Sequence, residues 1–432
     1  MIDPQIAAYD VIVAGGGAGG VGAAVGAAQS GARVALIERA PFLGGAATLS
    51  NVLTYCGYWT QADPPRECVG GVGADVLRTI GRYDGYEGPV RMSSSNVVVA
   101  LLDPEAVKIA LDRVCEEAGV DVLLHAMIVD AHSEGELVKS VRVHDHSGAR
   151  TLHAPAFVDA SGEADLATYA GVATHYGGPD GRVQNGTLAI RFGGIERTAD
   201  VHRAIWQRAI RDGKARGLRE LTKEHGLVVR LPGSNDVIAF LADEAFDARD
   251  ARSLSVAERS ARKQAWAYLE AIRALPGHEH AYIVSTGPSI GTRESRHVVA
   301  RTQLQAVDIE AGLIPGDTIA LGGWPVEYHG GPGEPNVWRR IRNNGAYGIG
   351  FEVICSASHT NIFSAGRTID ADAYAFASAR VMGTAFATGH AAGIAAAQRA
   401  RDGTVNAERV RAELIKQGAL IDAPRSERTL SA

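Results

Sequence analysis

Residues 9–38 read YDVIVAGGGAGGVGAAVGAAQSGARVALIE, and this stretch decides the fold. Two short apolar runs enclose a glycine-rich turn and a series of small residues, an order that predicts strand, turn, helix and second parallel strand. Gly15 suits the tight turn, Gly17 lets the backbone approach a pyrophosphate, and Gly20 lets the helix pack closely on the strand. The stretch therefore predicts a Rossmann-like unit that binds a dinucleotide.

The end of the second strand bears on the identity of that dinucleotide. Glu38 follows the apolar run 34–37 and is placed to accept hydrogen bonds from a ribose diol. A carboxylate here disfavours a 2′-phosphate, because like charges repel. The helix that opens at Ala18 and Gly19 points its amide end at the phosphates. These residues alone leave both FAD and NAD as ligands.

Four later segments choose between the two. They are 44–48 (GGAAT), 157–165 (FVDASGEAD), 361–367 (NIFSAGR) and 378–393 (SARVMGTAFATGHAAG). In this order they resemble the GG-x-A-T, VDATGDAD, NLLVAGR and S-x-RVMGT…GQAAG segments of FAD-dependent oxidoreductases related to the fumarate reductase flavoproteins. That resemblance implies a glutathione-reductase-type FAD fold, with FAD as the cofactor.

The resemblance also implies where FAD binds. The helix that begins near Met382 is expected to aim its positive end at the flavin ring, where it stabilises negative charge. No histidine adjoins segment 44–48 as an obvious covalent tether, so we expect non-covalent FAD. We predict an FAD site formed by Gly15, Gly17, Ala18, Gly19, Gly20, Glu38, Arg39, Gly44, Gly45, Ala46, Ala47, Thr48, Ile128, Ala160, Ser161, Gly162, Asp165, Gly366, Arg367, Met382, Gly383 and Thr384.

The same matches predict the domain organisation. The predicted fold class is α/β: a Rossmann-like FAD-binding domain with a parallel sheet and a β-meander, joined to a discontinuous α+β substrate or cap domain. Family matches become sparse after residue 170 and resume near residue 347. We therefore expect the first part of the FAD-binding domain at 1–170, the cap domain at 171–346, the return segment at 347–400 and a helical tail at 401–432.

Composition limits the partners and the location. Of the 432 residues, 46% are hydrophobic and 21% are charged, and the net charge of −6 provides no basic field for nucleic acid or an anionic membrane. We find no signal segment and no apolar run near the ~20 residues of a membrane helix. Four cysteines without C-x-x-C spacing indicate neither zinc nor an iron–sulfur cluster. We expect a soluble cytoplasmic protein that binds no metal; a homo-oligomer is compatible with the sequence.

Two arginines near the end of the cap domain are candidates for substrate binding. Segment 291–296 (GTRESR) resembles the RESRR stretch of the family, and the guanidinium groups of Arg293 and Arg296 suit recognition of a carboxylate. In the alternative interpretation, Glu294 and both arginines form a structural ion-pair network.

Two further residues complete the predicted reaction site. His329, in the loop 324–330, is a candidate acid or base because imidazole titrates near neutral pH; the alternative is an exposed loop histidine. Arg380 is a candidate to stabilise the reduced flavin or to bind a substrate carboxylate. The alternative for Arg380 is an ion pair with Asp370 or Asp372.

Segment 51–59 (NVLTYCGYW) follows the GGAAT segment and is expected to run near the flavin ring. Tyr55 is therefore a candidate residue of the substrate pocket. Cys56 and Cys355 are expected near the flavin as well; each is either a reactive thiol or, as we favour, an inert buried one.

These residues predict a FAD-dependent oxidoreductase of the dehydrogenase or reductase type, which transfers a hydride between a small, anionic organic substrate and flavin N5. Two alternatives stay open: a monooxygenase that uses dioxygen, and a non-catalytic electron-relay subunit. No second strand–glycine–helix fingerprint follows Gly20, so we expect neither NADH nor NADPH to reduce the flavin directly. Electrons then pass to or from the substrate, dioxygen or a separate carrier.

Overall fold

A five-stranded parallel sheet forms the centre of the molecule. The computed structural model describes residues 9–92, 95–331 and 334–423. The strand order is β21-β10-β1-β2-β6, and every neighbouring pair is parallel. The strands are β1 (Val11–Ala14), β2 (Val34–Ile37), β6 (Asp121–Leu123), β10 (Ala156–Asp159) and β21 (Ile362–Ser364). This arrangement confirms the predicted α/β class.

Alternating side chains of the sheet divide the core into two layers. Val11 and Val13 of β1 pack with helices α1 (Ala18–Gln29) and α10 (Met382–Asp402) on one face. Ile12 and Ala14 pack on the other face against the antiparallel meander β7 (Met127–Glu134), β8 (Leu137–Asp145) and β9 (Gly148–His153). Ala154 and Pro155 separate β9 of the meander from β10 of the sheet.

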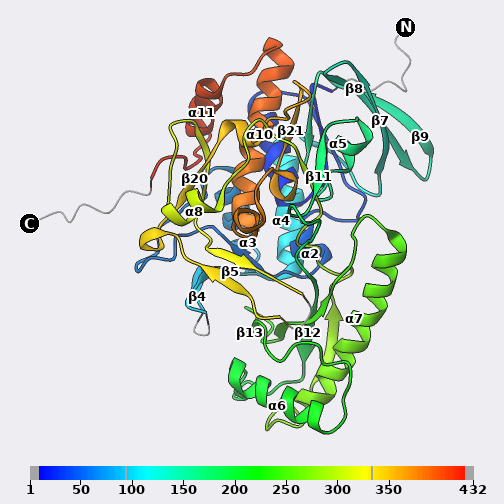
Figure 1. The fold of residues 1–432 in the computed structure, drawn as a ribbon, viewed down its shortest axis with the longest axis vertical. Coiled ribbons are helices and arrows are strands. Elements are labelled where there is room, and N and C mark those ends of the chain that lie inside the picture. Colours follow the sequence, from blue (N-terminus) through cyan, green and yellow to red (C-terminus); the bar gives the residue numbers. More distant parts are fainter. Residues whose placement is uncertain (1–8, 93–94, 332–333, 424–432) are drawn as a thin grey trace, which may run out of the picture.

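Helices α1 and α10 come from opposite ends of the sequence and lie side by side (Figure 1). Glycines permit their close approach. A Cβ atom on Gly389 would lie 2.0 Å from the Gly19 carbonyl oxygen, and one on Gly393 would lie 1.9 Å from the Ala23 carbonyl oxygen. Larger residues would force the helices apart, so these glycines hold the start of α10 close to the glycine-rich turn.

A second lobe with a core of its own occupies the lower part of Figure 1. Its antiparallel sheet has the order β13-β14-β12-β15, and helix α7 (Ala251–Ile272) packs on it. Its core extends from Leu188 to Ile290, whereas Leu304 already packs in the main core. The second lobe therefore lies inside the expected cap segment 171–346; that segment's boundaries stay a prediction.

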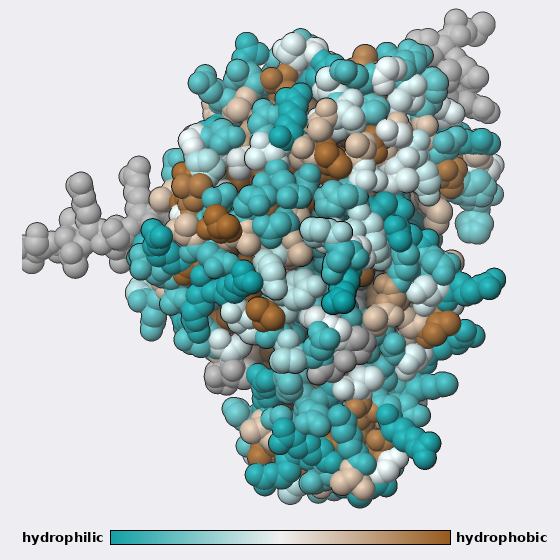
Figure 2. All heavy atoms as spheres, viewed as in Figure 1, coloured by the Kyte–Doolittle hydropathy of each residue, from teal (hydrophilic) through white to brown (hydrophobic). Residues whose placement is uncertain are grey.

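No helix among the described residues is both long enough and apolar enough to cross a bilayer. Figure 2 shows polar side chains over most of one face, with apolar residues scattered among them.

The remaining strands are β3 (Thr54–Cys56), β4 (Pro89–Arg91), β5 (Val98–Leu101), β11 (Thr174–Tyr176), β12 (Gly186–Gly193), β13 (Val228–Arg230), β14 (Val237–Glu244), β15 (Tyr282–Thr286), β16 (Arg296–Val298), β17 (Thr318–Gly322), β18 (Val326–Tyr328), β19 (Val337–Arg339) and β20 (Tyr347–Gly350). The remaining helices are α2 (Ala46–Leu49), α3 (Val72–Gly81), α4 (Pro104–Glu117), α5 (Asp165–Tyr169), α6 (Arg203–Ala215), α8 (Ala306–Ala311), α9 (Ala373–Ala379) and α11 (Ala407–Lys416), with 3-10 turns at Arg342–Asn344, Phe351–Val353 and Gly366–Thr368.

Candidate active site

The turn between β1 and α1 has the backbone that a pyrophosphate requires. Gly15 has a φ of +90°, and a Cβ on Gly20 would lie 1.7 Å from the Gly15 carbonyl oxygen, so both positions need glycine. A Cβ on Gly17 would meet only the Gly45 Cα atom, at 3.8 Å, which leaves space for a ligand. The start of α1 has no side-chain cap and no acid in its first turn. Its free N–H groups and positive dipole end therefore suit a bound phosphate.

Glu38 stands where a ribose would lie, at the end of β2. Its buried carboxylate accepts hydrogen bonds from the backbone N–H of Gly16 (2.6 Å) and of Ala40 (2.7 Å). These bonds fix the carboxylate beside the glycine-rich turn and still leave lone pairs for a ribose diol. Arg39, by contrast, is exposed, and Ile128 packs in the core of the meander.

The other predicted FAD segments converge on this turn. The backbone N–H of Gly44 donates to the Gly16 carbonyl (2.8 Å), which seats segment 44–48 on the turn. The Arg367 guanidinium forms an ion pair with Glu163 (3.2 Å), and a Cβ on Gly162 would lie 2.1 Å from that guanidinium. The structure thus brings segments 44–48, 160–165 and 366–367 around one site, and their chemistry fits FAD.

The start of α10 resembles the start of α1 in lacking a cap. Val381 provides no side-chain cap, and the first turn contains no acid. Met382 lines a neighbouring cavity, and the buried Thr384 hydroxyl has no hydrogen-bond partner. A Cβ on Gly383 would lie 2.7 Å from the Cys56 carbonyl oxygen, so this approach also requires glycine. The positive end of α10 is therefore free to face a bound, electron-rich ring.

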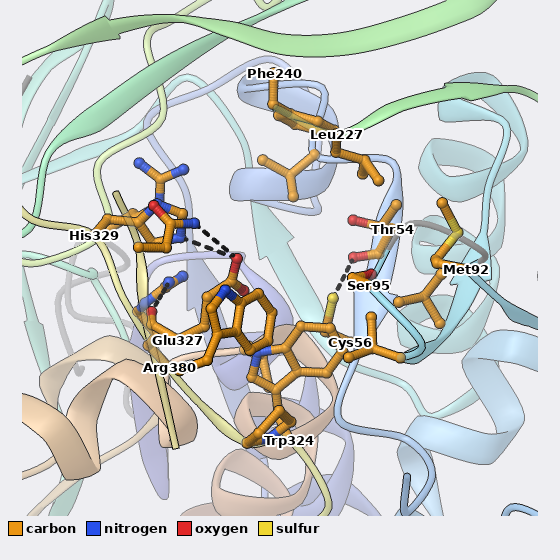
Figure 3. A pocket seen from close by; sticks show the side chains of 18 of the residues that line it. Thr54, Cys56, Met92, Ser95, Leu227, Phe240, Trp324, Glu327, His329 and Arg380 are labelled. Carbon is orange, nitrogen blue, oxygen red and sulfur yellow. Dashed lines mark hydrogen bonds and ion pairs between the residues drawn. The ribbon is translucent and has the colours of Figure 1, made fainter. Parts of the chain in front are cut away.

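A cavity of about 620 Å³ connects the FAD segments with the second lobe (Figure 3). Ala46, Arg367 and Met382 line one part of it, and Leu227 and Phe240 of the second lobe line another. This volume is within the range of small-molecule sites. The cavity therefore has room for a small organic molecule beside the segments predicted to bind FAD.

An acid and a histidine lie close together in this cavity. Glu327 of β18 and the following His329 are separated by one residue, so their side chains point to the same side. His329 Nε2 lies 3.4 Å from Glu327 Oε1, while His329 Nδ1 is buried and has no hydrogen-bond partner. The interpretation of His329 as an exposed loop residue was wrong, since its exposure is only 8%.

Burial and the charge of Arg293 lower the pKa of His329 to about 3, so its imidazole is neutral. Burial opposes ionisation of the Glu327 carboxyl, yet its interactions with His329 and the nearby arginines outweigh burial and hold its pKa below the ordinary value. The pair is therefore a neutral imidazole beside a carboxylate. Glu327 was not among the predicted site residues, although the spacing Glu-x-His on a strand indicates such a pair.

Arg293 and Arg380 bring positive charge to the same cavity. Arg293 donates to the Asn185 carbonyl, and Arg380 donates to the Glu327 carbonyl (3.2 Å). Burial and the charge of Arg293 lower the pKa of Arg380 to about 10, and its Nε is buried without a partner. Both guanidinium groups are thus held by neutral backbone oxygens.

Comparisons with known proteins assign this site to a family. Residues 10–417 match the family described as FAD dependent oxidoreductase. The chain belongs to this family. FAD is therefore its cofactor, as predicted. No curated protein matches the sequence.

Several solved structures resemble this FAD-dependent oxidoreductase at low identity. One is a geranylgeranyl bacteriochlorophyll reductase-like protein from Thermoplasma acidophilum, with 14% identity, a TM-score of 0.47, and coverage of 95% of this chain and 84% of that one. Another is p-nitrophenol 4-monooxygenase from Pseudomonas putida, with 10% identity, a TM-score of 0.47, and coverage of 95% and 85%. A third is a flavin-dependent brominase variant, with 13% identity, a TM-score of 0.49, and coverage of 95% and 83%.

The structure does not bring Arg296 of the oxidoreductase to the cavity. Its guanidinium binds the Asp165 carboxylate (2.6 Å) and the Glu163 carbonyl (2.8 Å). The Glu294 carboxylate instead lies 3.4 Å from His297 Nε2 and accepts a hydrogen bond from the Gln184 backbone. Arg296 therefore has a structural ion pair, but with an acid other than the predicted Glu294.

The alternative ion pairs of Arg380 are not those of the structure. Asp370 interacts with His175 (3.0 Å) and accepts a hydrogen bond from the Gln303 amide (2.8 Å), and Asp372 caps helix α9. Both predicted partners thus interact with other groups, and the Arg380 side chain lines the cavity instead.

Tyr55 also lies outside the cavity, because alternation along β3 turns its side chain into the main core. Its ring stacks on Tyr58 with a centroid distance of 5.8 Å, and the residue is fully buried. The neighbouring Thr54 and Cys56 face the cavity instead. Segment 51–59 therefore contributes to the pocket, but through other residues than Tyr55.

The thiols near the cofactor site are poor nucleophiles. Burial raises the pKa of Cys56 to about 12 and that of Cys355 to about 12, so both stay protonated near neutral pH. Cys56 lines the cavity, whereas Cys355 is buried and donates weakly to the Phe351 carbonyl. In the part of the chain that the structure describes, no group of three or more His, Cys, Asp or Glu residues could hold a metal ion.

Proposed function

We propose that this oxidoreductase transfers a hydride between a small organic anion, held in the 620 Å³ cavity, and FAD. When bound, FAD supplies hydride chemistry at N5 of its ring. One observation carries the proposal: residues of the FAD segments, the half-buried Arg293 and Arg380, and the Glu327–His329 pair all line one cavity. The resemblance to fumarate reductase flavoproteins supports a dehydrogenase or reductase.

Arg293 and Arg380 bind the anionic group of the substrate. Half-buried guanidinium groups that lack a carboxylate partner are strong donors for a planar anion. Their mutual repulsion, which contributes to the lowered pKa of Arg380, is relieved when an anion lies between them. This contact orients the substrate relative to the rest of the cavity.

His329 handles the proton that accompanies hydride transfer. With Nε2–H directed at Glu327, the unpartnered Nδ1 keeps its lone pair for a substrate proton. The charge of Arg293 is one cause of the low pKa of His329, so an anion on Arg293 raises that pKa when the substrate binds. Glu327 then stabilises the imidazolium, as carboxylates do beside catalytic histidines.

Anaerobic titration of the purified holoprotein tests the proposal. Oxidised protein is mixed with a panel of organic anions, and chemically reduced protein is mixed with their unsaturated or carbonyl counterparts. We expect at least one pair to bleach or restore the flavin absorbance. No change in either direction with any anion would contradict the proposal. Substrate-dependent consumption of dioxygen by the reduced protein would instead support the monooxygenase alternative.

A further inference from the structure

An apolar wall lies in the same cavity as the two arginines. Met92, Val97, Val99, Trp324 and Val381 form a small buried cluster that is separate from the main core. All of its members line the cavity, and the partly buried Leu227 of the second lobe packs against the cluster and lines the cavity too. Figure 3 shows Met92 and Leu227 on the side of the cavity opposite His329 and Arg380. The cavity is therefore apolar on one side and charged on the other.

Unpartnered polar atoms occur where these two sides meet. Trp324 Nε1, Arg380 Nε and His329 Nδ1 are buried, and none has a hydrogen-bond partner. All three residues line the cavity, and Trp324 and His329 are more than nine-tenths buried. Buried polar groups usually have partners because leaving them unpaired is costly. A ligand with acceptor atoms for the N–H groups of Trp324 and Arg380, and with a proton for the lone pair of His329 Nδ1, would supply them.

The charges at this position favour a ligand with one negative charge. Of the other cations that line the cavity, Lys223 is paired with Asp243 (3.1 Å) and Arg367 with Glu163 (3.2 Å). Arg340 is exposed to solvent, and Arg203 is half-buried at the start of α6 in the second lobe. Among the described residues, no carboxylate lies within ion-pair distance of Arg293 or Arg380. Glu327 is the acid that lines the cavity beside them. Two guanidinium charges and one carboxylate leave a single positive charge to neutralise.

We infer that the substrate is an amphipathic monocarboxylate, whose carboxylate binds Arg293 and Arg380 and whose apolar, preferably aromatic, body packs on Trp324, Leu227 and the rest of the apolar wall. The inference rests on the proposed function and adds the class of substrate. The Trp324 and Trp338 rings, 6.3 Å apart, provide a surface for a planar body. A short dicarboxylate would leave the apolar wall uncovered and would bring a second negative charge beside Glu327.

Four matched probes test this inference in the oxidised holoprotein by calorimetry: 3-phenylpropanoate, its primary amide, propanoate and succinate. We expect 3-phenylpropanoate to bind about 10- to 100-fold more tightly than the amide, which lacks the charge. It should bind more tightly than propanoate by about 10-fold or more, since its phenyl group buries apolar surface. Equal binding of the amide, propanoate or succinate, or no binding of 3-phenylpropanoate, would overturn the inference.

Two variants assign the effects to the two sides of the cavity. Arg293→Gln should reduce the preference for the carboxylate over the amide, and Leu227→Ala should reduce the preference for 3-phenylpropanoate over propanoate. Each variant should leave the other preference unchanged. Arg301→Gln is the matched control, because Arg301 is exposed and pairs with Glu352 (3.2 Å) outside the cavity. Identical losses in all three variants would show a general folding defect and contradict the assignment.

The two proposals fail in different ways. If 3-phenylpropanoate binds as expected and no organic anion changes the flavin redox state, the proposed hydride transfer is wrong and the binding specificity stands. If organic anions without an apolar body reduce the flavin well, hydride transfer stands and the amphipathic specificity is wrong.

Discussion

His329 Nε2 lies 3.4 Å from Glu327 Oε1, inside a cavity that Arg293 and Arg380 also line. Since one residue separates the two on an extended segment, strand geometry alone directs both side chains to the same side. The carboxylate fixes the imidazole tautomer by accepting from Nε2 and leaves Nδ1 for a substrate. The backbone at the end of β18 thus brings together the pair that we propose for proton transfer, without help from distant elements.

Replacing His329 by Gln should lower turnover about 100-fold, because general acid–base catalysis contributes on that order. Glu327→Gln should cause a smaller loss, since the imidazole remains while its orientation and charge stabilisation weaken. Steady-state kinetics with the substrate found by anaerobic titration measure both effects. FAD content should equal that of the exposed control His132→Gln. Unchanged turnover in His329→Gln would remove this residue from the reaction.

The pH dependence of stability gives an independent test of the buried imidazole. The pKa of His329 is lowered from 6.5 to about 3 in the folded chain. Between these values the unfolded chain binds a proton that the folded chain does not, so acidification destabilises the folded state by at most about 1.4 kcal/mol per pH unit. Thermal unfolding of the wild-type protein and His329→Gln is compared at about pH 7 and about pH 5.

The wild-type protein should lose more thermal stability over this interval than the variant. Glu327 does not interfere, because its lowered pKa places its own contribution below the ordinary carboxyl value of 4.5. Equal losses in both proteins would mean that His329 titrates normally in the folded chain.

Local sequence signals predicted the elements that depend on neighbours in the chain. The cap of α4 is one example, because Asp103 accepts from the backbone N–H of Glu105 (2.9 Å) as its sequence position predicts. Local signals can also mislead, as at the start of α7. The sequence from Ser255 to Glu258 has the spacing of a capping box, yet Asp250 caps the helix, and Ser255 donates to the Ala251 carbonyl within it. Asp250 and Ser255 are both capping residues by type, and the helix begins after the earlier of the two.

The direction of side chains and the pairing of residues far apart in the chain could not be predicted from the sequence. The direction of Tyr55 depends on the face of β3 that packs on the core, and sequence cannot show this for a strand of three residues. The sequence also could not show whether Arg296 binds substrate or forms a structural ion pair, since its partner Asp165 lies 131 residues away in the chain. The apolar side of the cavity combines segments near Met92, Leu227 and Trp324, which only the tertiary fold brings together.

Gly17→Ala should weaken FAD binding without unfolding the chain. A Cβ at this position finds space in the protein, 3.8 Å from its nearest neighbour, but it would occupy the approach to the phosphates. The flavin-to-protein ratio after dialysis and the melting temperature of the apoprotein measure the two effects. Gly316→Ala is the matched control, an exposed glycine whose added Cβ would meet nothing within 4 Å. Full FAD retention in Gly17→Ala would contradict the assigned pyrophosphate position.

Neither NADH nor NADPH should reduce the flavin within seconds under anaerobic conditions. The basis is that the sequence contains one dinucleotide fingerprint, which the FAD site uses. Stopped-flow mixing with each nucleotide, with and without 3-phenylpropanoate, measures the rate. Rapid reduction by either nucleotide would favour the monooxygenase alternative.

The same preparation should release its flavin into the supernatant on acid precipitation, since the cofactor is expected to be non-covalent.

Arg380→Met and Arg296→Met should have opposite effects, although both remove one half-buried positive charge. Arg380 lines the cavity, so its loss should raise the Michaelis constant about 10- to 100-fold and leave FAD content and melting temperature nearly unchanged. Arg296 holds Asp165 and the Glu163 carbonyl, so its loss should lower stability by about 1 kcal/mol or more with little change in the Michaelis constant. Kinetics, flavin content and thermal unfolding are measured for both variants. Because the variants share the same chemical change, a raised Michaelis constant in Arg296→Met with normal stability would return Arg296 to the substrate site, and a normal Michaelis constant in Arg380→Met would remove Arg380 from it.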